Sequence, residues 1–308
     1  MFIEEQGEGH IKDRLYVYWD VTTKCNYNCS YCYSRPKYLK TSSWQCNGDV
    51  KKQQLVLSAI KLSTLPVYLG LHGGEPTLHH DYENFIQQTL RSLVRPLDQL
   101  YIATNASPKI LKTPDSSKIR VLASFHPEFA SAERFIKTVK ALCTRFKVKV
   151  NVLLHPDPKY RNSLHKVYND CLALGIKVHP HFIYDCSDGE VLWDYSQQFY
   201  DEFSYMINAN CWYEFKDHNN VVTRVSDLEL FKNHMNDFFN WDCYNNNYEI
   251  LLDGVLHKIC SSEFVDLTKN PLALRNITSI NPMKCPFKQC LSDGVLKCLK
   301  TYPQSHEH

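Results

Sequence analysis

Short apolar runs of strand length alternate with amphipathic helical patterns along the first two thirds of the chain. The predicted strands are Arg14–Val21, Val67–Leu71, Leu100–Thr104, Arg120–Phe125, Lys147–Leu154 and Lys177–Ile183. The predicted helices are Lys52–Leu62, Tyr82–Leu93, Ala132–Cys143 and Asn162–Leu174. Alternation of this kind predicts an α/β fold with a parallel sheet and crossover helices. The six strand units do not support a full barrel of eight.

The pattern changes after about residue 193. The segment Ser196–Ile207 is typical of a helix, and a β-hairpin signal follows, in which two apolar segments at 248–252 and 255–259 flank Asp253-Gly254. An Asp-Gly pair suits a type I′ turn. Five cysteines lie between Cys243 and Cys298. The sequence therefore predicts a parallel α/β domain over residues 1–195 and a small cysteine-rich module over residues 196–308.

The charge balance and the cysteine content limit the partners and the compartment. The 308 residues carry a formal net charge of +2, so no strong field for nucleic acid or acidic membrane is expected. No apolar run approaches the length of a transmembrane helix, and the acidic start Met1–Glu5 lacks the features of a signal peptide. The 13 cysteines favour reduced thiols and metal ligation over disulfides. We expect a cytoplasmic protein.

Three cysteines follow the first predicted strand in a C-x3-C-x2-C arrangement, at Cys25, Cys29 and Cys32. Thiolates are the usual ligands of iron–sulfur clusters, and four of them fill a [4Fe–4S] cubane. Three neighbouring ligands therefore leave one iron open for a substrate or cofactor. A zinc site, with Cys46 as a further ligand, or a set of buried free thiols is the alternative.

A glycine-rich tetrapeptide, Gly73-Gly74-Glu75-Pro76, directly follows the second predicted strand. Two glycines let the backbone approach a ligand closely, and the Glu75 carboxylate can accept hydrogen bonds from an ammonium group. An ordinary strand-end turn is the alternative. We expect a carboxylate at a strand end to contribute little to the core.

The cysteine triplet and the glycine-rich tetrapeptide together resemble the radical S-adenosylmethionine (SAM) superfamily. The resemblance implies a partial (β/α)6 TIM-type barrel whose [4Fe–4S] cluster binds SAM. Reductive cleavage of SAM then gives a 5′-deoxyadenosyl radical that abstracts a hydrogen atom from the substrate. The residues implied to contact SAM are Gly73, Gly74, Glu75, Pro76, Thr104, Asn105 and Ser124. The superfamily often has a glycine after Thr-Asn, where this chain has Ala106, so the turn must tolerate a Cβ atom.

The C-terminal cysteines resemble the SPASM or twitch extension of that superfamily, which binds auxiliary [4Fe–4S] clusters. The spacing departs from the extension, because five residues separate the hairpin glycine from Cys260 where four are usual. The tail also lacks the C-x2-C-x5-C-x3-C pattern. We therefore expect at most one auxiliary cluster, held by Cys243, Cys260, Cys285 and Cys290, with Cys298 as a substitute ligand. A structural zinc ion is the alternative.

Four residues are candidates for direct action on the substrate. His126 and His155 each end a predicted strand and precede a proline, and the carboxyl ends of parallel barrel strands converge on the active site. A structural role is the alternative for each histidine. Cys186 and Cys211 follow the sixth strand and lie at the module boundary, so either could return a hydrogen atom to a substrate radical.

The resemblance implies an enzyme of oxidoreductase or epimerase type with a reductase of flavodoxin or ferredoxin type as electron donor. The favoured substrate is a residue of a peptide or protein, changed by epimerisation, oxidation or crosslinking. The near alternative is a carbohydrate, an aminocyclitol or another small polar metabolite. A remote alternative is a non-catalytic scaffold with zinc at both cysteine sets.

Overall fold

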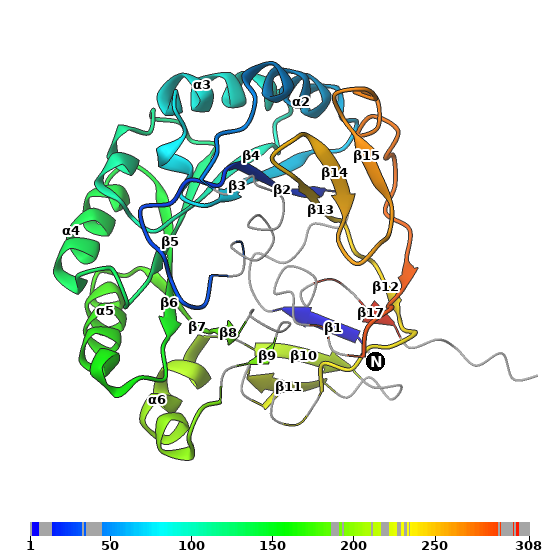
Figure 1. Cartoon of the computed structure of the whole chain (residues 1–308). Helices are drawn as coiled ribbons and strands as arrows, with labels where there is room; N and C mark the ends of the chain where they lie inside the picture. The colour runs from blue at the N-terminus through cyan, green and yellow to red at the C-terminus, as the bar shows by residue number, and fades with distance from the viewer. Residues whose placement is uncertain are drawn as a thin grey trace, which may run out of the picture.

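One nine-stranded sheet, in the order β15-β14-β13-β2-β3-β4-β5-β6-β7, forms the centre of the structure (Figure 1). The computed structural model describes residues 2–5, 14–32, 34, 45–185, 191–192, 194–210, 212–216, 222–226, 229–230, 233, 235–288, 290, 298 and 300–301. Strands β2 to β7 are parallel to their neighbours. Their bounds are Leu15–Thr22 (β2), Val67–Gly73 (β3), Gln99–Thr104 (β4), Ile119–Phe125 (β5), Lys147–Leu154 (β6) and Lys177–Phe182 (β7). The six-stranded parallel barrel-type sheet confirms the prediction, and each strand lies within two residues of its predicted bounds.

Helices cover the outer face of this sheet (Figure 1). Their bounds are Val50–Leu62 (α2), Tyr82–Ser92 (α3), Ala132–Cys143 (α4), Arg161–Ala173 (α5) and Gln197–Asn210 (α6). Short 3-10 turns stand at Pro76–Leu78 (η1), Pro108–Lys112 (η2) and Pro158–Tyr160 (η3). No described helix is long and apolar enough to cross a membrane.

Alternating strand residues form two apolar clusters with these helices. The first joins β2, β3 and β4 to α2 and α3, and within it Trp19 contacts Phe85 with ring centroids 5.4 Å apart. The second joins β5, β6 and β7 to α4, α5 and α6, where Phe125 packs on Phe135. Because strand side chains alternate between faces, the other strand residues lie on the face opposite the helices. We call that face the inner face.

The predicted hairpin is present and extends the same sheet. Strand β13 (Asn247–Ile250) pairs antiparallel with β14 (Val255–Lys258), which pairs with β15 (Phe264–Asp266). Gly254 adopts a φ of 90° in the connecting turn, a conformation that favours glycine. Strand β13 also runs parallel to β2, so the C-terminal part of the chain is hydrogen-bonded to the strand that precedes the cysteine triplet.

The remaining strands form three small sheets that the sequence analysis did not predict. They are β1 (Phe2–Glu5) with β10 (Trp212–Lys216) and β11 (Val222–Ser226), β12 (Asp242–Cys243) with β16 (Met283–Lys284) and β17 (Lys300–Thr301), and β8 (Tyr184–Asp185) with β9 (Val191–Leu192). Helix α6 packs with β7, and its Phe199 and Phe203 belong to the second apolar cluster. The packing therefore joins α6 to the barrel, while the division of the chain at residue 195 stays a prediction.

The helix-side core should carry much of the stability. Leu69 on β3 is 0% exposed, whereas Leu62 at the end of α2 is 42% exposed. Leu69→Ala should lower the free energy of unfolding by about 2–5 kcal/mol, because it leaves a cavity in the core. The matched Leu62→Ala should change it by less than about 0.5 kcal/mol. Urea titration followed by circular dichroism measures both, and equal losses would contradict this account of the core.

Candidate active site

The cysteine triplet lies on a loop that follows β2 directly. The backbone N–H of Cys32 donates to the carbonyl of Cys29 (3.3 Å), and the N–H of Tyr27 donates to Cys25 Sγ (3.3 Å). Cys29 is buried, while Cys25 and Cys32 are half-buried. The loop thus folds back on its own thiols instead of extending into solvent.

Burial makes these thiols hard to ionise. It raises the pKa of Cys25 to about 11 and that of Cys29 to about 12, and the nearby Cys32 thiol raises both further. Because metals bind the thiolate, ligation must release protons. Among the described residues, no three His, Cys, Asp or Glu side chains are arranged as ligands of a single ion. The donor set itself, three electrostatically coupled thiols on one loop, fits the chemistry of an iron–sulfur cluster with an open iron.

The glycine-rich tetrapeptide packs against the start of the cysteine loop. Gly74 N–H donates to Thr22 O (2.8 Å), and Glu75 N–H donates to Lys24 O (2.7 Å). A Cβ atom at Gly73 would lie 2.1 Å from Thr22 O, and one at Gly74 would lie 2.2 Å from Lys24 O. Gly73 also has a φ of 114°. Both glycines are therefore required for the contact between the two loops.

Glu75 is fully buried, contrary to our expectation of a strand-end carboxylate that adds little to the core. It accepts hydrogen bonds from Thr104 Oγ1 (2.8 Å), Asn105 N (2.7 Å) and Thr77 N (3.2 Å). Burial raises the pKa of this carboxyl, and the three donors oppose that shift by stabilising the carboxylate. Glu75 thus ties the ends of β3 and β4 together.

The residues predicted to lie near SAM gather around the same strand ends. Asn105 donates through Nδ2 to Asn26 Oδ1 (2.8 Å) and lies 4.0 Å from Cys25 Sγ. Ala106 adopts a φ of 57°, as expected for a turn that tolerates a Cβ atom where glycine is usual. Pro76 begins η1. Ser124 lies on the inner face of β5, one residue from its end.

A half-buried acid and two histidines, which follow β5 and β6, contact the cysteine loop. Glu128 accepts from Ser30 N (2.8 Å) and from Ser30 Oγ (2.5 Å), and its Oε1 lies 3.3 Å from His155 Nε2. Because Asp157 N donates to His155 Nδ1, the Nε2 atom carries the proton and donates to Glu128. We name Ser30, Glu128 and His155 the loop clamp. The sequence analysis missed Glu128, although an acid just after a strand-end His-Pro pair could have pointed to it.

His126 contacts the cysteine loop directly. Its Nδ1 lies 3.4 Å from Cys29 Sγ and 3.4 Å from Tyr31 Oη, and its ring is parallel to that of Tyr31. Burial lowers its pKa to about 4, so the imidazole is neutral near pH 7. Both predicted histidines thus lie beside the cysteine loop, and catalytic action by either remains a prediction. Cys186 and Cys211 lie outside the described residues.

The structure gathers all five C-terminal cysteines in one cluster. Cys243, Cys260, Cys285, Cys290 and Cys298 pack with Phe238 and Trp241. Cys243 on β12 is the register partner of Met283 on β16, and Cys285 N–H donates to Trp241 O (2.8 Å). Asn247 Nδ2 donates to Cys298 Sγ (3.1 Å). The hairpin and the small β12 sheet together bring the thiols into one place.

A buried lysine lies next to these thiols. Lys300 is 0% exposed, donates through Nζ to Cys298 O (3.2 Å) and lies 5.1 Å from the centre of the Phe238 ring. Burial raises the pKa of Cys290 and of Cys298 to about 12, and the Lys300 charge opposes that shift. A cation at this position favours the thiolate forms that metals bind. Sequence reasoning missed Lys300, whose only signal was its place two residues after Cys298.

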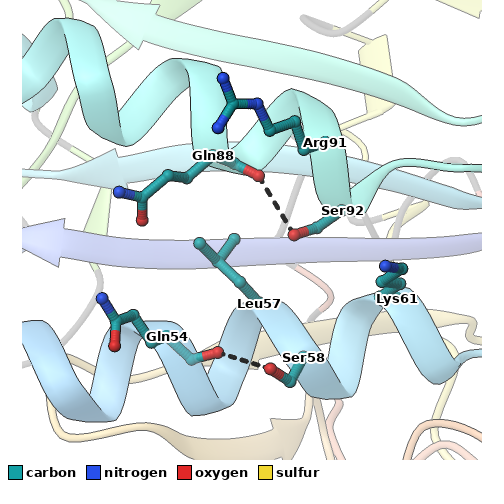
Figure 2. A pocket seen from close by; sticks show the side chains of 7 residues that line it. All are labelled: Gln54, Leu57, Ser58, Lys61, Gln88, Arg91 and Ser92. Atoms are coloured by element: carbon teal, nitrogen blue, oxygen red, sulfur yellow. Dashed lines mark hydrogen bonds between the residues drawn. The ribbon is translucent and has the colours of Figure 1, made fainter.

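A shallow groove of about 300 Å³ lies elsewhere, between α2 and α3 (Figure 2). Leu57 lies between the two helices there, and Ser58 and Ser92 donate to the carbonyls of Gln54 and Gln88 in their own helices. None of its lining residues is a histidine, a cysteine or an acid. The groove therefore lacks the cysteine, histidine and acid side chains that gather at the strand ends on the inner side.

Comparison with known proteins gives a result only at the level of structure. No family model matches the sequence, and no curated protein matches it. SuiB from Streptococcus suis superposes with a TM-score of 0.53 at 14% identity, and the match covers 87% of this chain and 66% of SuiB, just under two thirds. The enzyme anSMEcpe, solved with bound AdoMet and Cp18Cys peptide, superposes with a TM-score of 0.54 at 13% identity over 86% of this chain and 82% of its own.

Both proteins are radical SAM enzymes with SPASM or twitch domains. The match covers most of this chain, so it is a match of the overall fold. The chain therefore has the fold of radical SAM enzymes.

Proposed function

We propose that this protein is a radical SAM enzyme that abstracts a hydrogen atom from a residue of a peptide substrate. When bound to Cys25, Cys29 and Cys32, a [4Fe–4S] cluster would supply the electron that cleaves SAM into methionine and a 5′-deoxyadenosyl radical. A reductase of flavodoxin or ferredoxin type would provide that electron. One observation carries the proposal: in a radical SAM fold, the triplet loop packs backbone to backbone on the Gly73–Glu75 loop.

The protein's own residues would hold and shield the reactants. The contact between Gly74 and Thr22 fixes the cysteine loop beside the carboxyl ends of β3 and β4. Glu75 and Asn105 order the backbone at those ends, where backbone carbonyls would accept hydrogen bonds from the ammonium group of SAM. Tyr31 and His126 cover the Cys29 side of the loop, which limits access of water to the thiol.

A peptide substrate is supported by the structural similarity to anSMEcpe, which was solved with a bound peptide. The C-terminal cysteine cluster would hold one auxiliary [4Fe–4S] cluster, with Cys243, Cys260, Cys285 and Cys290 as ligands. Such a cluster suits a reaction that removes an electron from a product radical. The nature of the change, whether epimerisation, oxidation or crosslinking, depends on the substrate.

Iron content tests the proposal most directly. The wild-type chain should hold about eight irons after anaerobic reconstitution, and a Cys25/Cys29/Cys32→Ala variant about four. The variant should also lose all formation of 5′-deoxyadenosine from SAM. If the wild type held about four irons and the variant none, the C-terminal cysteines would hold zinc or no metal. Zinc at both sites with no SAM cleavage in the wild type would contradict the proposal and support a non-catalytic scaffold.

The loop clamp should control how firmly the first cluster is held. Glu128→Ala removes the acceptor of both Ser30 hydrogen bonds and should weaken iron retention about 10-fold or more, as loss of a ligand-orienting residue usually does. Glu128→Gln keeps one carbonyl acceptor and should lose less. Iron release to a chelator, followed by absorbance, measures the effect. Glu133→Gln, at an exposed position on α4, is the matched control. Equal retention in the wild type and Glu128→Ala would show that the clamp is dispensable.

Lys300 should matter for metal binding more than for folding. Lys300→Met keeps an unbranched side chain in the buried position but removes the cation beside the thiols. In the Cys25/Cys29/Cys32→Ala background, where only the C-terminal site remains, this variant should bind iron at least about 10-fold more weakly. The control is Lys284→Met on β16, whose side chain is 57% exposed and pairs with Asp242. A large loss of apoprotein stability with unchanged iron affinity would reverse this assignment.

A further inference from the structure

The three cysteines of the triplet lie in different surroundings. Cys29 is 6% exposed, whereas Cys25 and Cys32 are half-buried. Cys25 Sγ accepts a hydrogen bond from the backbone N–H of Tyr27 (3.3 Å), and its side-chain neighbour Asn105 lies farther away, at 4.0 Å. The closest contacts of Cys29 Sγ are instead made by side chains, so they depend on which residues the chain carries there.

Two side chains contact the Cys29 sulfur. His126 Nδ1 lies 3.4 Å from Cys29 Sγ, and the Tyr31 hydroxyl is hydrogen-bonded to the same sulfur. The same Nδ1 atom lies 3.4 Å from Tyr31 Oη, and the two rings are nearly parallel, with 4° between their planes. The sulfur, the hydroxyl and the imidazole nitrogen therefore form one compact polar group.

Iron binding would determine which way these hydrogen bonds run. A ligating sulfur is a thiolate, which has lone pairs but no proton to donate. A bare Nδ1 lone pair facing this thiolate would be repelled, whereas a proton on Nδ1 makes the contact a hydrogen bond. The Tyr31 hydroxyl can then donate to the sulfur as well. The thiolate thus favours the state in which both His126 and Tyr31 donate to Cys29.

The acid closest to His126 in the sequence is already engaged. Glu128 accepts two hydrogen bonds from Ser30 and one from His155, within the loop clamp. Its negative charge is therefore compensated by three donors of its own. The two donors at the Cys29 sulfur remain directed at the position of the cluster.

We propose that His126 and Tyr31 donate hydrogen bonds to the Cys29 sulfur and thereby raise the reduction potential of the cluster held by the triplet. The inference rests on the proposed function, because it concerns the same cluster. Reduction adds one electron, supplied by the reductase, and part of its charge is carried by the ligand sulfurs. Donors directed at a sulfur stabilise that charge, and burial strengthens each of these hydrogen bonds.

A redox titration followed by EPR tests the proposal on the reconstituted full-length protein. The first cluster is identified as the signal that the Cys25/Cys29/Cys32→Ala variant lacks. Tyr31→Phe and His126→Leu each remove one donor. At a fixed potential, each should lower the ratio of reduced to oxidised cluster about tenfold, which corresponds to about 59 mV for one electron. His126→Asn can place an amide N–H near the position of Nδ1 and should restore most of the potential.

A second measurement detects the hydrogen bonds themselves. After exchange into D2O, the EPR signal of the reduced wild type should show couplings to deuterons, and each donor variant should lose one of them. Tyr195→Phe is the matched control, because Tyr195 is 5% exposed and its hydroxyl donates to Leu154 O (2.6 Å) and accepts from Ile183 N (3.0 Å). It should leave the potential unchanged, even where it lowers the thermal midpoint.

Unchanged potentials in Tyr31→Phe and His126→Leu would overturn the proposal. Tyr31→Phe is isosteric, so it gives this result even where His126→Leu fails to hold the cluster. A rise in potential in either variant would also overturn it, because the side chain would then act by excluding water and not by donating. A wild type that forms 5′-deoxyadenosine but gives either result contradicts this inference alone. A wild type without the cluster signal contradicts the proposed function as well.

Discussion

The structure depends on a backbone contact between two loops that is too close for any side chain. The carbonyls of Thr22 and Lys24 accept hydrogen bonds from the loop after β3, and glycine is the only residue that fits at positions 73 and 74. The side chain of Glu75 is buried and accepts hydrogen bonds from Thr104 and Asn105 at the end of β4. Three strand ends are thereby fixed as one unit, and the position of the first cysteine follows from it.

The two faces of the sheet carry different kinds of side chain. Apolar side chains between the strands and the outer helices form both large clusters of the core. The core therefore does not require apolar side chains on the inner face, which carries tyrosines, histidines and cations. Buried charges normally require compensation, which restricts them to positions where partners or ligands are available. A half-buried face rich in such groups is suited to a polar substrate.

The sequence predicted the barrel strands, their helices and the hairpin, because each of these has a strong local pattern. The strand runs are apolar on the helix side, and Asp253-Gly254 specifies its own turn. The pairing of β1 with β10 and of β12 with β17 could not be predicted, since strands of two to five residues carry no periodicity of their own. Glu128 and Lys300 were missed for a different reason. The partner of Glu128, Ser30, is 98 residues away in the sequence, and Lys300 has no motif of its own.

The pairing of β13 with β2 joins two segments that are made at very different times during synthesis. Asn246 Nδ2 donates to the carbonyl of Arg14 across a separation of 232 residues. During synthesis, β2 emerges early but remains an unpaired edge on that side until residues 246–250 have left the ribosome. Contacts of such long range form slowly. The cysteine triplet thus acquires its full support only after β13 has been made, and a nascent chain would need protection of that edge until then.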